Sequence, residues 1–271
     1  MNMSEKNQMS RTPIPLQDGR PAFVDATTGR PLAEKPEEMT HLRGNRLVPK
    51  QHPRIRFRGM LDSLTAEILC VQQEAFSAGE QALTEHLQEM LEYVRGILGA
   101  EVKETALGEI CLEGMTGEQL RHASHHIRET AGIDHRIPDY SMGRRALELN
   151  RLRTKIRETE LAAAEAFADP LKGCTRGDIV QGLNRLSSYA YILSCREAAA
   201  QMGIEQALPE EKTAAGHGAC GSRLITEKEA AVMLAALPEE VRKIHLDSGA
   251  IITPSARDIF LRGRVEVIAD E

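Results

Sequence analysis

Tryptophan is absent from this 271-residue sequence, and aromatic residues of all kinds make up only 3% of it. Aromatic and β-branched residues dominate the cores of β-sandwiches, so their scarcity argues against that class of fold. Alanine, leucine, glutamate and arginine are plentiful instead, and these residues favour helices. With 41% hydrophobic residues, the chain can still bury a sizeable core.

The sequence also lacks a secretory signal peptide, an apolar run of about 18 residues and any Cys-x-x-Cys pair. These absences predict a cytoplasmic protein with reduced thiols and no association with a membrane. The net charge is -6, which together with the scarce aromatic residues disfavours nucleic acid as a partner. The cysteines, which we expect to be small buried hydrophobes, are Cys70, Cys111, Cys174, Cys195 and Cys220.

Changes of composition divide the chain into four parts. Residues 1–35 are rich in proline, glycine, threonine, aspartate and arginine without sustained periodicity, and we expect them to be disordered. Helical patterns fill residues 36–202, and residues 203–223 form a linker that contains several glycines. Residues 224–271 combine short helix and strand patterns. The expected architecture is an all-α domain with a small C-terminal αβ appendage.

A helix predicted over residues 149–167 has no glycine or proline and stands at the centre of the helical domain. Arg153, Arg157 and Glu160 recur at helical spacing beside its apolar face. These charges need partners, because an unpaired guanidinium next to a core is costly. The plain alternative is a set of charges that only stabilises the helix surface. The apolar face comprises Leu149, Leu152, Ile156, Ala163 and Phe167, and Arg151, Lys155, Glu158 and Glu165 point the other way.

Four basic residues surround Pro53, which opens another predicted helix. Backbone N–H groups and the helix dipole favour anions at such a position. The pattern therefore predicts either an anion site or a solvated basic edge. The basic residues are Lys50, Arg54, Arg56 and Arg58, and the apolar stripe of the helix is Leu61, Leu64, Ile68, Val71 and Ala75.

The helix that we expect to begin at Asp178, as its N-cap, has two distinct faces. One face is apolar. The other carries small polar groups, whereas a solvated face usually carries lysine and glutamate. This polar face predicts either that the helix forms a wall of a ligand site or that another helix packs closely against it. The apolar face is Ile179, Leu183, Leu186, Ala190 and Leu193, and the polar one is Asn184, Ser187, Ser188 and Tyr191.

A capping box formed by Thr116 and Gln119 opens a helix that carries His122 and His126. Two histidines at i and i+4 can hold zinc. No third ligand stands at a fixed spacing, so we expect a surface cluster of histidines and no metal site.

The spacing of Arg153, Arg157 and Glu160, followed by Asn-Arg-Leu-Ser at residues 184–187, resembles the paired signature of ATP:cob(I)alamin adenosyltransferases. The sequence Leu-Arg-Thr-Lys-Ile-Arg-Glu-Thr-Glu at residues 152–160 is most similar to the ethanolamine-utilisation type. The propanediol-utilisation type shares a looser form of both motifs.

This resemblance implies an up-and-down bundle of about five helices. It also implies transfer of the adenosyl group of ATP, which would arrive with Mg²⁺, to the cobalt of reduced cobalamin, with release of triphosphate. ATP would lie at an interface of a homo-oligomer, a trimer or a dimer. The ethanolamine-utilisation type further implies a location in a bacterial microcompartment, with microcompartment proteins as partners.

A third motif, Lys-x-x-Pro-Arg followed by Gly-x-x-Asp at residues 50–62, completes the roles that the resemblance implies. Lys50 would bind triphosphate, Asp62 would pair with Arg153, and Glu160 would orient the arginines. The implied catalytic residues are Asp62, Arg153, Arg157 and Glu160. The implied ATP-binding residues are Lys50, Arg54, Arg153, Arg157 and Asn184, and the candidates for cobalamin contact are Phe57, Tyr140 and Tyr189.

Two departures from the family pattern affect these expectations. Where metal-dependent members carry a Cys-Cys-x-x-Cys cluster, residues 24–28 of this chain read Val-Asp-Ala-Thr-Thr, which leaves no thiolate to bind a metal. Residues 224–271 resemble a segment that enteric members carry at their N-terminus, so the order is permuted. Both departures leave an alternative: a non-catalytic corrinoid or nucleotide carrier, or a microcompartment assembly protein.

Overall fold

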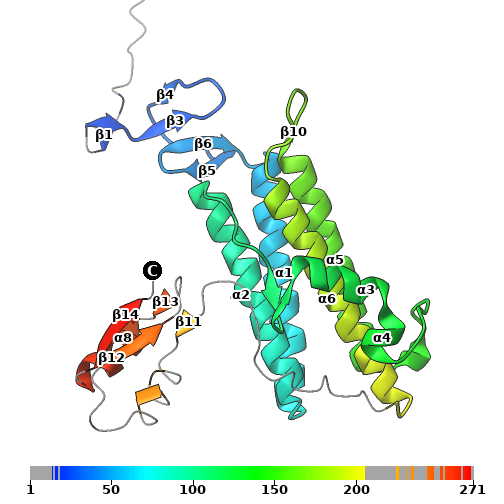
Figure 1. Cartoon of the computed structure of the whole chain (residues 1–271). Coiled ribbons are helices and arrows are strands. Elements are labelled where there is room, and N and C mark those ends of the chain that lie inside the picture. The colour runs from blue at the N-terminus through cyan, green and yellow to red at the C-terminus, as the bar shows by residue number, and fades with distance from the viewer. Residues whose placement is uncertain are drawn as a thin grey trace, which may run out of the picture.

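The computed structural model describes residues 14, 16–17, 19–204, 224–225, 230, 233–234, 243–246, 251–252, 254–263 and 265–269. Four long helices dominate it: α1 (Pro53–Ser77), α2 (Gln81–Lys103), α5 (Arg144–Ala166) and α6 (Gly177–Gln201). They run side by side as an up-and-down bundle in which α1 packs between α2 and α5, and α5 packs on α6 (Figure 1). The predicted helical bundle is thereby confirmed.

Helix α1 begins where the sequence predicts a start. His52 is the N-cap, its side chain accepts from the backbone N–H of Arg54, and proline occupies the first turn. Proline suits this place, because its missing N–H would have no partner inside the helix. Gly79 follows the helix with a φ of +76°, which lets the chain turn back into α2 at little cost.

Shorter helices cover one side of the bundle: α3 (Gly117–His125), α4 (Ile127–Ala131) and the 3₁₀ turn η1 (Tyr140–Met142). The capping box at the start of α3 is confirmed, since the side chains of Thr116 and Gln119 each accept from the other's backbone N–H. Helices α3 and α4 both pack against α6.

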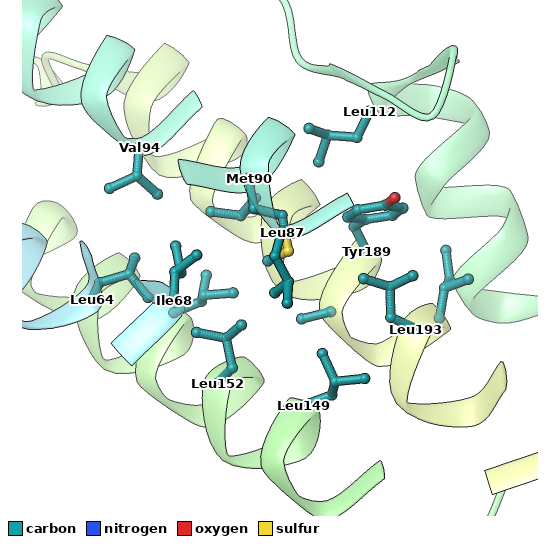
Figure 2. Packing of buried hydrophobic residues seen from close by; sticks show 14 of the residues in the cluster. Leu64, Ile68, Leu87, Met90, Val94, Leu112, Leu149, Leu152, Tyr189 and Leu193 are labelled. Carbon is teal, nitrogen blue, oxygen red and sulfur yellow. The ribbon is translucent and has the colours of Figure 1, made fainter. Parts of the chain in front are cut away.

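The core lies where the apolar stripes of the four long helices meet (Figure 2). The predicted stripe residues of α1, α5 and α6 are all buried, which confirms the helical periodicity. Burying one leucine-sized side chain contributes about 1.5–3 kcal/mol, so this seam provides most of the stabilisation of the fold. The labelled core residues in Figure 2 include Leu64, Ile68, Leu87, Met90, Val94, Leu149, Leu152 and Leu193.

The expectation that residues 1–35 are disordered is wrong for the described part of that segment. Strands β1 (Leu16–Gln17) and β2 (Arg20–Pro21) pair with each other, and β3 (Phe23–Asp25) and β4 (Pro31–Leu32) belong to a four-stranded sheet with β5 (Met39–Arg43) and β6 (Arg46–Pro49), in the order β4-β3-β6-β5.

The polar residues of this segment, whose composition suggested disorder, form ordered turns. The Asp25 carboxylate accepts from the backbone N–H groups of Thr27 and Thr28, and Gly29 has a φ of +73°. Such an Asx turn followed by a glycine closes the β3–β4 hairpin. Residues 1–13 lie outside the described part of the chain.

The predicted N-cap role of Asp178 is wrong by two positions. Arg176 is the N-cap residue, and Asp178 lies in the first turn of α6. Its carboxylate accepts from the backbone N–H of Leu107 at 2.9 Å and pairs with Arg176 at 2.9 Å. Hydrogen bonding to Arg176 lowers the pKa of Asp178 to about 2. The carboxylate therefore ties the loop after α2 to the start of α6.

Two further hairpins cap the ends of helices: β7 (Cys111–Leu112) with β8 (Met115–Thr116), and β9 (Ala168–Asp169) with β10 (Gly173–Cys174). The expectation of buried thiols is confirmed for Cys195, but Cys111 is only partly buried and Cys70 and Cys174 are exposed. Cys220 lies outside the described residues. No described helix is long and apolar enough to cross a membrane.

The C-terminal part is a small αβ unit, as predicted. Strand β11 (Leu224–Ile225) pairs in parallel with β13 (Ile251–Ile252), and β12 (Lys243–Leu246) pairs in parallel with β14 (Glu266–Ala269). Helix α8 spans Pro254–Arg262. This C-terminal unit has a buried cluster of its own, which consists of Ala230, Ile244, Phe260 and Val265. Of the predicted linker, residues 205–223 lie outside the described residues.

A buried carboxylate joins α1, α2 and the sheet. Glu101 is completely buried, and its two oxygens accept from Nε of Arg54 and Nε of Arg58, each at 2.6 Å. Arg58 also donates through Nη2 to the backbone carbonyl of Leu42 in β5 at 2.7 Å. Because a buried charge is tolerated only when it is paired, these contacts fix the three elements together.

We expect Glu101→Ala to lower the free energy of unfolding by about 3 kcal/mol or more, because it removes the buried carboxylate that Arg54 and Arg58, both largely buried, share. Urea denaturation followed by circular dichroism measures this change. Glu37→Ala, which removes only an exposed ion pair with Lys50, is the control and should keep the wild-type midpoint. A Glu101→Ala midpoint equal to that of the wild type would contradict the proposed role of this carboxylate.

Candidate active site

A cleft of about 710 Å³ opens between α3, α5, α6 and the loop that precedes η1. We call it the α5–α6 cleft. A cleft of this size suits a ligand as large as a nucleotide. It is lined by Arg121, Ser124, His125, His135, Arg136, Pro138, Asn150, Arg153, Arg157, Asn184, Arg185, Ser187, Ser188 and Tyr191.

Positive charge is concentrated in this cleft. Its lining includes five arginines and no aspartate or glutamate, although the chain as a whole carries a net charge of -6. Clefts lined by one sign of charge attract ligands of the opposite sign. Arginine also offers a planar fork of donors that matches phosphate oxygens. The cleft therefore has the charge and the donors that a polyanionic ligand would require.

Helix geometry brings Arg153 and Arg157 to the cleft. Both follow the buried stripe of α5 on the side that faces α6, as their spacing predicts. In contrast, Arg151 on the other side of α5 pairs with Glu67 of α1 at 2.6 Å. Within the described residues, no carboxylate forms an ion pair with Arg121, Arg153, Arg157 or Arg185. An anionic ligand would supply the missing partner.

Glu160 takes a different role from the one expected. Its carboxylate accepts from Nδ2 of Asn184 at 3.0 Å, and Oδ1 of Asn184 accepts from Nη1 of Arg185 at 2.7 Å. In the described part of the chain, Glu160 forms no ion pair with Arg153 or Arg157. It therefore fixes the Asn184 amide, which in turn fixes Arg185. The whole predicted polar face of α6 lines the cleft.

Lys50 and Arg54 lie at the other end of the bundle. The Arg54 guanidinium stacks over the ring of Phe167 at 6.0 Å, and Phe167 follows Arg153 by 14 residues. At about 1.5 Å per residue, the two arginines are about 20 Å apart along α5. Arg54 is already engaged by Glu101 and Glu104, and Lys50 pairs with Glu37 at 2.9 Å.

Asp62 is exposed on α1 and forms no ion pair with any described residue. It lies about 140° around the helix from the core-facing Phe57, at 100° per residue, on the side away from α5. The expected pair between Asp62 and Arg153 is therefore not formed within one chain. A pair between these side chains requires a second copy of the chain.

Of the three candidates for cobalamin contact, only Tyr140 is at the surface, with 93% of it exposed. Phe57 is fully buried and packs edge-to-face on Phe167 at 5.6 Å. Tyr189 is also fully buried, and burial raises the pKa of its phenol. Both rings are buried because Phe57 lies on the apolar face of α1 and Tyr189 on that of α6, among the core leucines. In this conformation neither of the two rings can touch a ligand.

A second cavity, of about 510 Å³, adjoins the first and shares Arg121 and Arg185 with it. Its lining has mixed charge, because Glu109, Glu118 and Asp178 also contribute to it. It is therefore a poorer place for a polyanion than the α5–α6 cleft.

Sequence reasoning missed three arginines of the cleft. Arg185 stands inside the Asn-Arg-Leu-Ser motif, and its place in that motif was the available signal. Arg121 on α3 and Arg136 in the following loop come close to α6 only because α3 and α4 pack against it. No spacing along the sequence reveals that contact.

His122 and His126 stack on each other with ring centroids 4.0 Å apart on the exposed side of α3. The Nδ1 atom of His126 bonds to the backbone carbonyl of His122 at 2.8 Å, which ties it to its own helix. Among the residues that the structure describes, no three histidine, cysteine, aspartate or glutamate side chains gather in a way that could hold a metal ion.

Comparison with known proteins identifies relatives. A family model described as cobalamin adenosyltransferase matches residues 32–197. The chain is 39% identical over 168 residues to the corrinoid adenosyltransferase EutT of Escherichia coli strain K12, and 37% identical over 168 residues to that of Salmonella typhimurium strain LT2. Each alignment covers 60% of this chain and 60% of the relative, so the chain spans less than two thirds of these curated relatives.

We expect the purified protein to contain no stoichiometric zinc or iron, because residues 24–28 form β3 and a turn without a thiolate. Elemental analysis measures the metal content, and melting with and without a chelator measures its effect on the fold. The prediction fails if one equivalent of metal is found and its removal lowers the melting temperature. His122 and His126 would then be the first ligands to replace.

Proposed function

The chain belongs to the cobalamin adenosyltransferase family, and on this premise we propose that it transfers the adenosyl group of ATP to the cobalt of a reduced corrinoid and releases triphosphate. One observation carries the proposal: the part of the chain that matches the family contains a cleft with five arginines and no carboxylate in its lining. A nucleotide triphosphate is the polyanion that such a cleft suits.

The chemistry requires little acid or base from the protein. Cobalt(I) attacks the ribose 5′ carbon with its electron pair, the bond from this carbon to oxygen breaks, and that electron pair leaves with triphosphate. The cobalt becomes formally cobalt(III). The protein has to orient the two substrates, stabilise the leaving triphosphate and exclude water.

The arginines of the cleft have the chemistry to stabilise the leaving group. We assign the triphosphate to Arg153 and Arg157 of α5, with Arg121 and Arg185 beside them. Asn184 is held by Glu160 and offers its amide to ATP. Mg²⁺ arrives with ATP and neutralises part of the phosphate charge. Tyr140 is the remaining candidate among the three for contact with the corrinoid, since it is exposed.

The active form is a homo-oligomer, a trimer or a dimer, with ATP between subunits. Lys50 and Asp62 do not line the α5–α6 cleft of their own chain, so a site that uses them with Arg153 combines two chains. The stripe of α1 that carries Asp62 also exposes Leu69 and Phe76 at seven-residue intervals. An exposed apolar stripe next to the required carboxylate is consistent with a subunit interface.

We place the reaction in the cytoplasm, where ATP is available. Association with a bacterial microcompartment rests on the resemblance to the ethanolamine-utilisation type alone, and no feature of the described residues argues for a particular microcompartment protein.

The wild-type protein should convert ATP and chemically reduced cobalamin to adenosylcobalamin, which absorbance spectra follow. Arg153→Lys should lower kcat/KM for ATP by about tenfold to a thousandfold, which corresponds to about 1.4–4 kcal/mol of lost positioning. The reason is that the ammonium group of lysine is a point charge and does not replace the planar fork of donors of arginine. Lys155→Arg, an exchange in the reverse direction on the opposite side of α5, is the matched control.

Two results would count against this assignment. A folded Arg153→Ala protein with wild-type kinetics would remove Arg153 from the site. A wild-type protein that binds ATP and corrinoid without forming adenosylcobalamin would favour the non-catalytic carrier instead.

We expect Asp62→Asn to lower ATP use over the same range, because it removes the carboxylate that would pair with Arg153 of another subunit. Co-expression of Asp62→Asn and Arg153→Lys chains with different tags gives mixed oligomers. Some interfaces in them carry both native residues, so their activity should exceed that of either single variant. Doubly tagged oligomers no more active than the single variants would rule out a pair between subunits.

A further inference from the structure

Tyr191 of α6 lies directly against Arg153. The central carbon of the Arg153 guanidinium is 5.3 Å from the centre of the Tyr191 ring, which is within the range of a cation–π contact. Both residues line the α5–α6 cleft. The sequence placed Tyr191 on a polar face, but the function assigned above gives it no role.

The Tyr191 ring is itself held in place. Its hydroxyl lies 2.7 Å from Nδ1 of His135, and the two rings are nearly parallel at an interplanar angle of 5°. The other ring nitrogen of His135 lies 3.3 Å from the backbone carbonyl of His125 at the end of α3. His135 thus links Tyr191 to an element that lines the opposite side of the cleft.

The phenol of Tyr191 is neutral near pH 7, and its surroundings favour this neutral form further. Burial raises the pKa of Tyr191, and the thiol of Cys195 lies within hydrogen-bond reach of its hydroxyl. A neutral phenol keeps its proton for hydrogen bonding. It also avoids a negative charge that would compete with phosphate for Arg153.

Arg153 needs such support more than Arg145 and Arg151 of the same helix do. Arg145 and Arg151 are fixed by carboxylates at 2.8 Å or less, whereas Arg153 forms no ion pair with a described residue. A guanidinium without a partner samples many rotamers, and binding a ligand must then pay for fixing it. A carboxylate in this place would fix Arg153 but would also repel triphosphate. An aromatic ring fixes the guanidinium without adding charge.

We propose that Tyr191, oriented by His135, is a positioning residue that holds the Arg153 guanidinium ready for the phosphate chain of ATP. The inference rests on the function proposed above and deepens it. Tyr191 need not touch either substrate, because it acts through Arg153. A purely structural role would instead make Tyr191 matter for stability and leave the affinity for phosphate unchanged in the folded protein.

Binding of inorganic triphosphate to the full chain, measured by calorimetry, tests the proposal without depending on turnover. Tyr191→Leu should weaken triphosphate binding by about threefold to thirtyfold, the range of one cation–π contact. The same variant should raise KM for ATP by a similar factor. Tyr191→Phe keeps the ring and should retain most of the affinity.

Double-mutant cycles separate positioning from packing. If Tyr191 acts through Arg153, Tyr191→Leu should cost little further affinity in an Arg153→Ala background. If His135 acts through the Tyr191 hydroxyl, His135→Ala should weaken binding about as much as Tyr191→Phe, and the two effects should not add. His122→Ala, which changes an exposed histidine outside the cleft, is the matched control and should bind like the wild type.

Equal triphosphate affinity in folded Tyr191→Leu and the wild type would overturn the proposal, as would an undiminished effect in the Arg153→Ala background. If Tyr191→Leu does not fold, Tyr191→Met, which also removes the ring but fills more of its volume, takes its place in the same cycle with Arg153→Ala. A wild-type protein that binds triphosphate but forms no adenosylcobalamin refutes the proposed function alone, and the binding series still tests Tyr191. A wild-type protein that does not bind triphosphate refutes both.

Discussion

Packing of α5 against α6 is the constraint on which the rest of the structure depends. The apolar stripe of α5 must be buried, and burying it turns the neighbouring stripe of Arg153 and Arg157 toward α6. Rotation of α5 that turned these arginines away from α6 would expose Leu152 and Ile156. The same packing brings the polar face of α6 to them. One hydrophobic seam therefore fixes the backbone of both helical walls of the cleft.

The distribution of ion pairs explains how an acidic protein keeps one cationic cleft. Several arginines outside the cleft are paired with nearby carboxylates, as Arg54 and Arg58 are with Glu101 and Arg151 is with Glu67. Carboxylates are excluded from the lining of the cleft itself. Within it, Arg136 pairs with Asp139 at 3.6 Å, just outside the lining, whereas Arg185 and Arg153 lie beside neutral groups, an amide and an aromatic ring respectively. Such groups fix the direction of a guanidinium while leaving its charge available to a ligand.

The separation of Asp62 from Arg153 within one chain underlies the proposed assembly of chains. A single chain holds the arginines of α5 in one place and Asp62 in another, with the two facing different directions. A buried pair would stabilise one chain, but a residue left exposed until chains meet couples binding to assembly. The proposed interface would thus give each substrate site a part from two subunits. Thermodynamically, nucleotide binding and association of chains would then stabilise each other.

The sequence alone determined the long helices and their apolar faces, because helix periodicity follows from the spacing of apolar residues and does not depend on distant contacts. The arrangement of these helices as an up-and-down bundle was implied by the resemblance to the family. The sequence also identified the charged stripe of α5 and the polar face of α6, since each is a property of one helix. Only the tertiary structure decided which charges are free. It showed Arg54 engaged by Glu101, Phe57 and Tyr189 inside the core, and strands where turn residues had suggested disorder. Ion pairs, cavities and strand pairing join residues far apart in the chain, and no local pattern encodes them. The cleft exists because α3 folds back on α6, which is a fact of packing and not of sequence spacing.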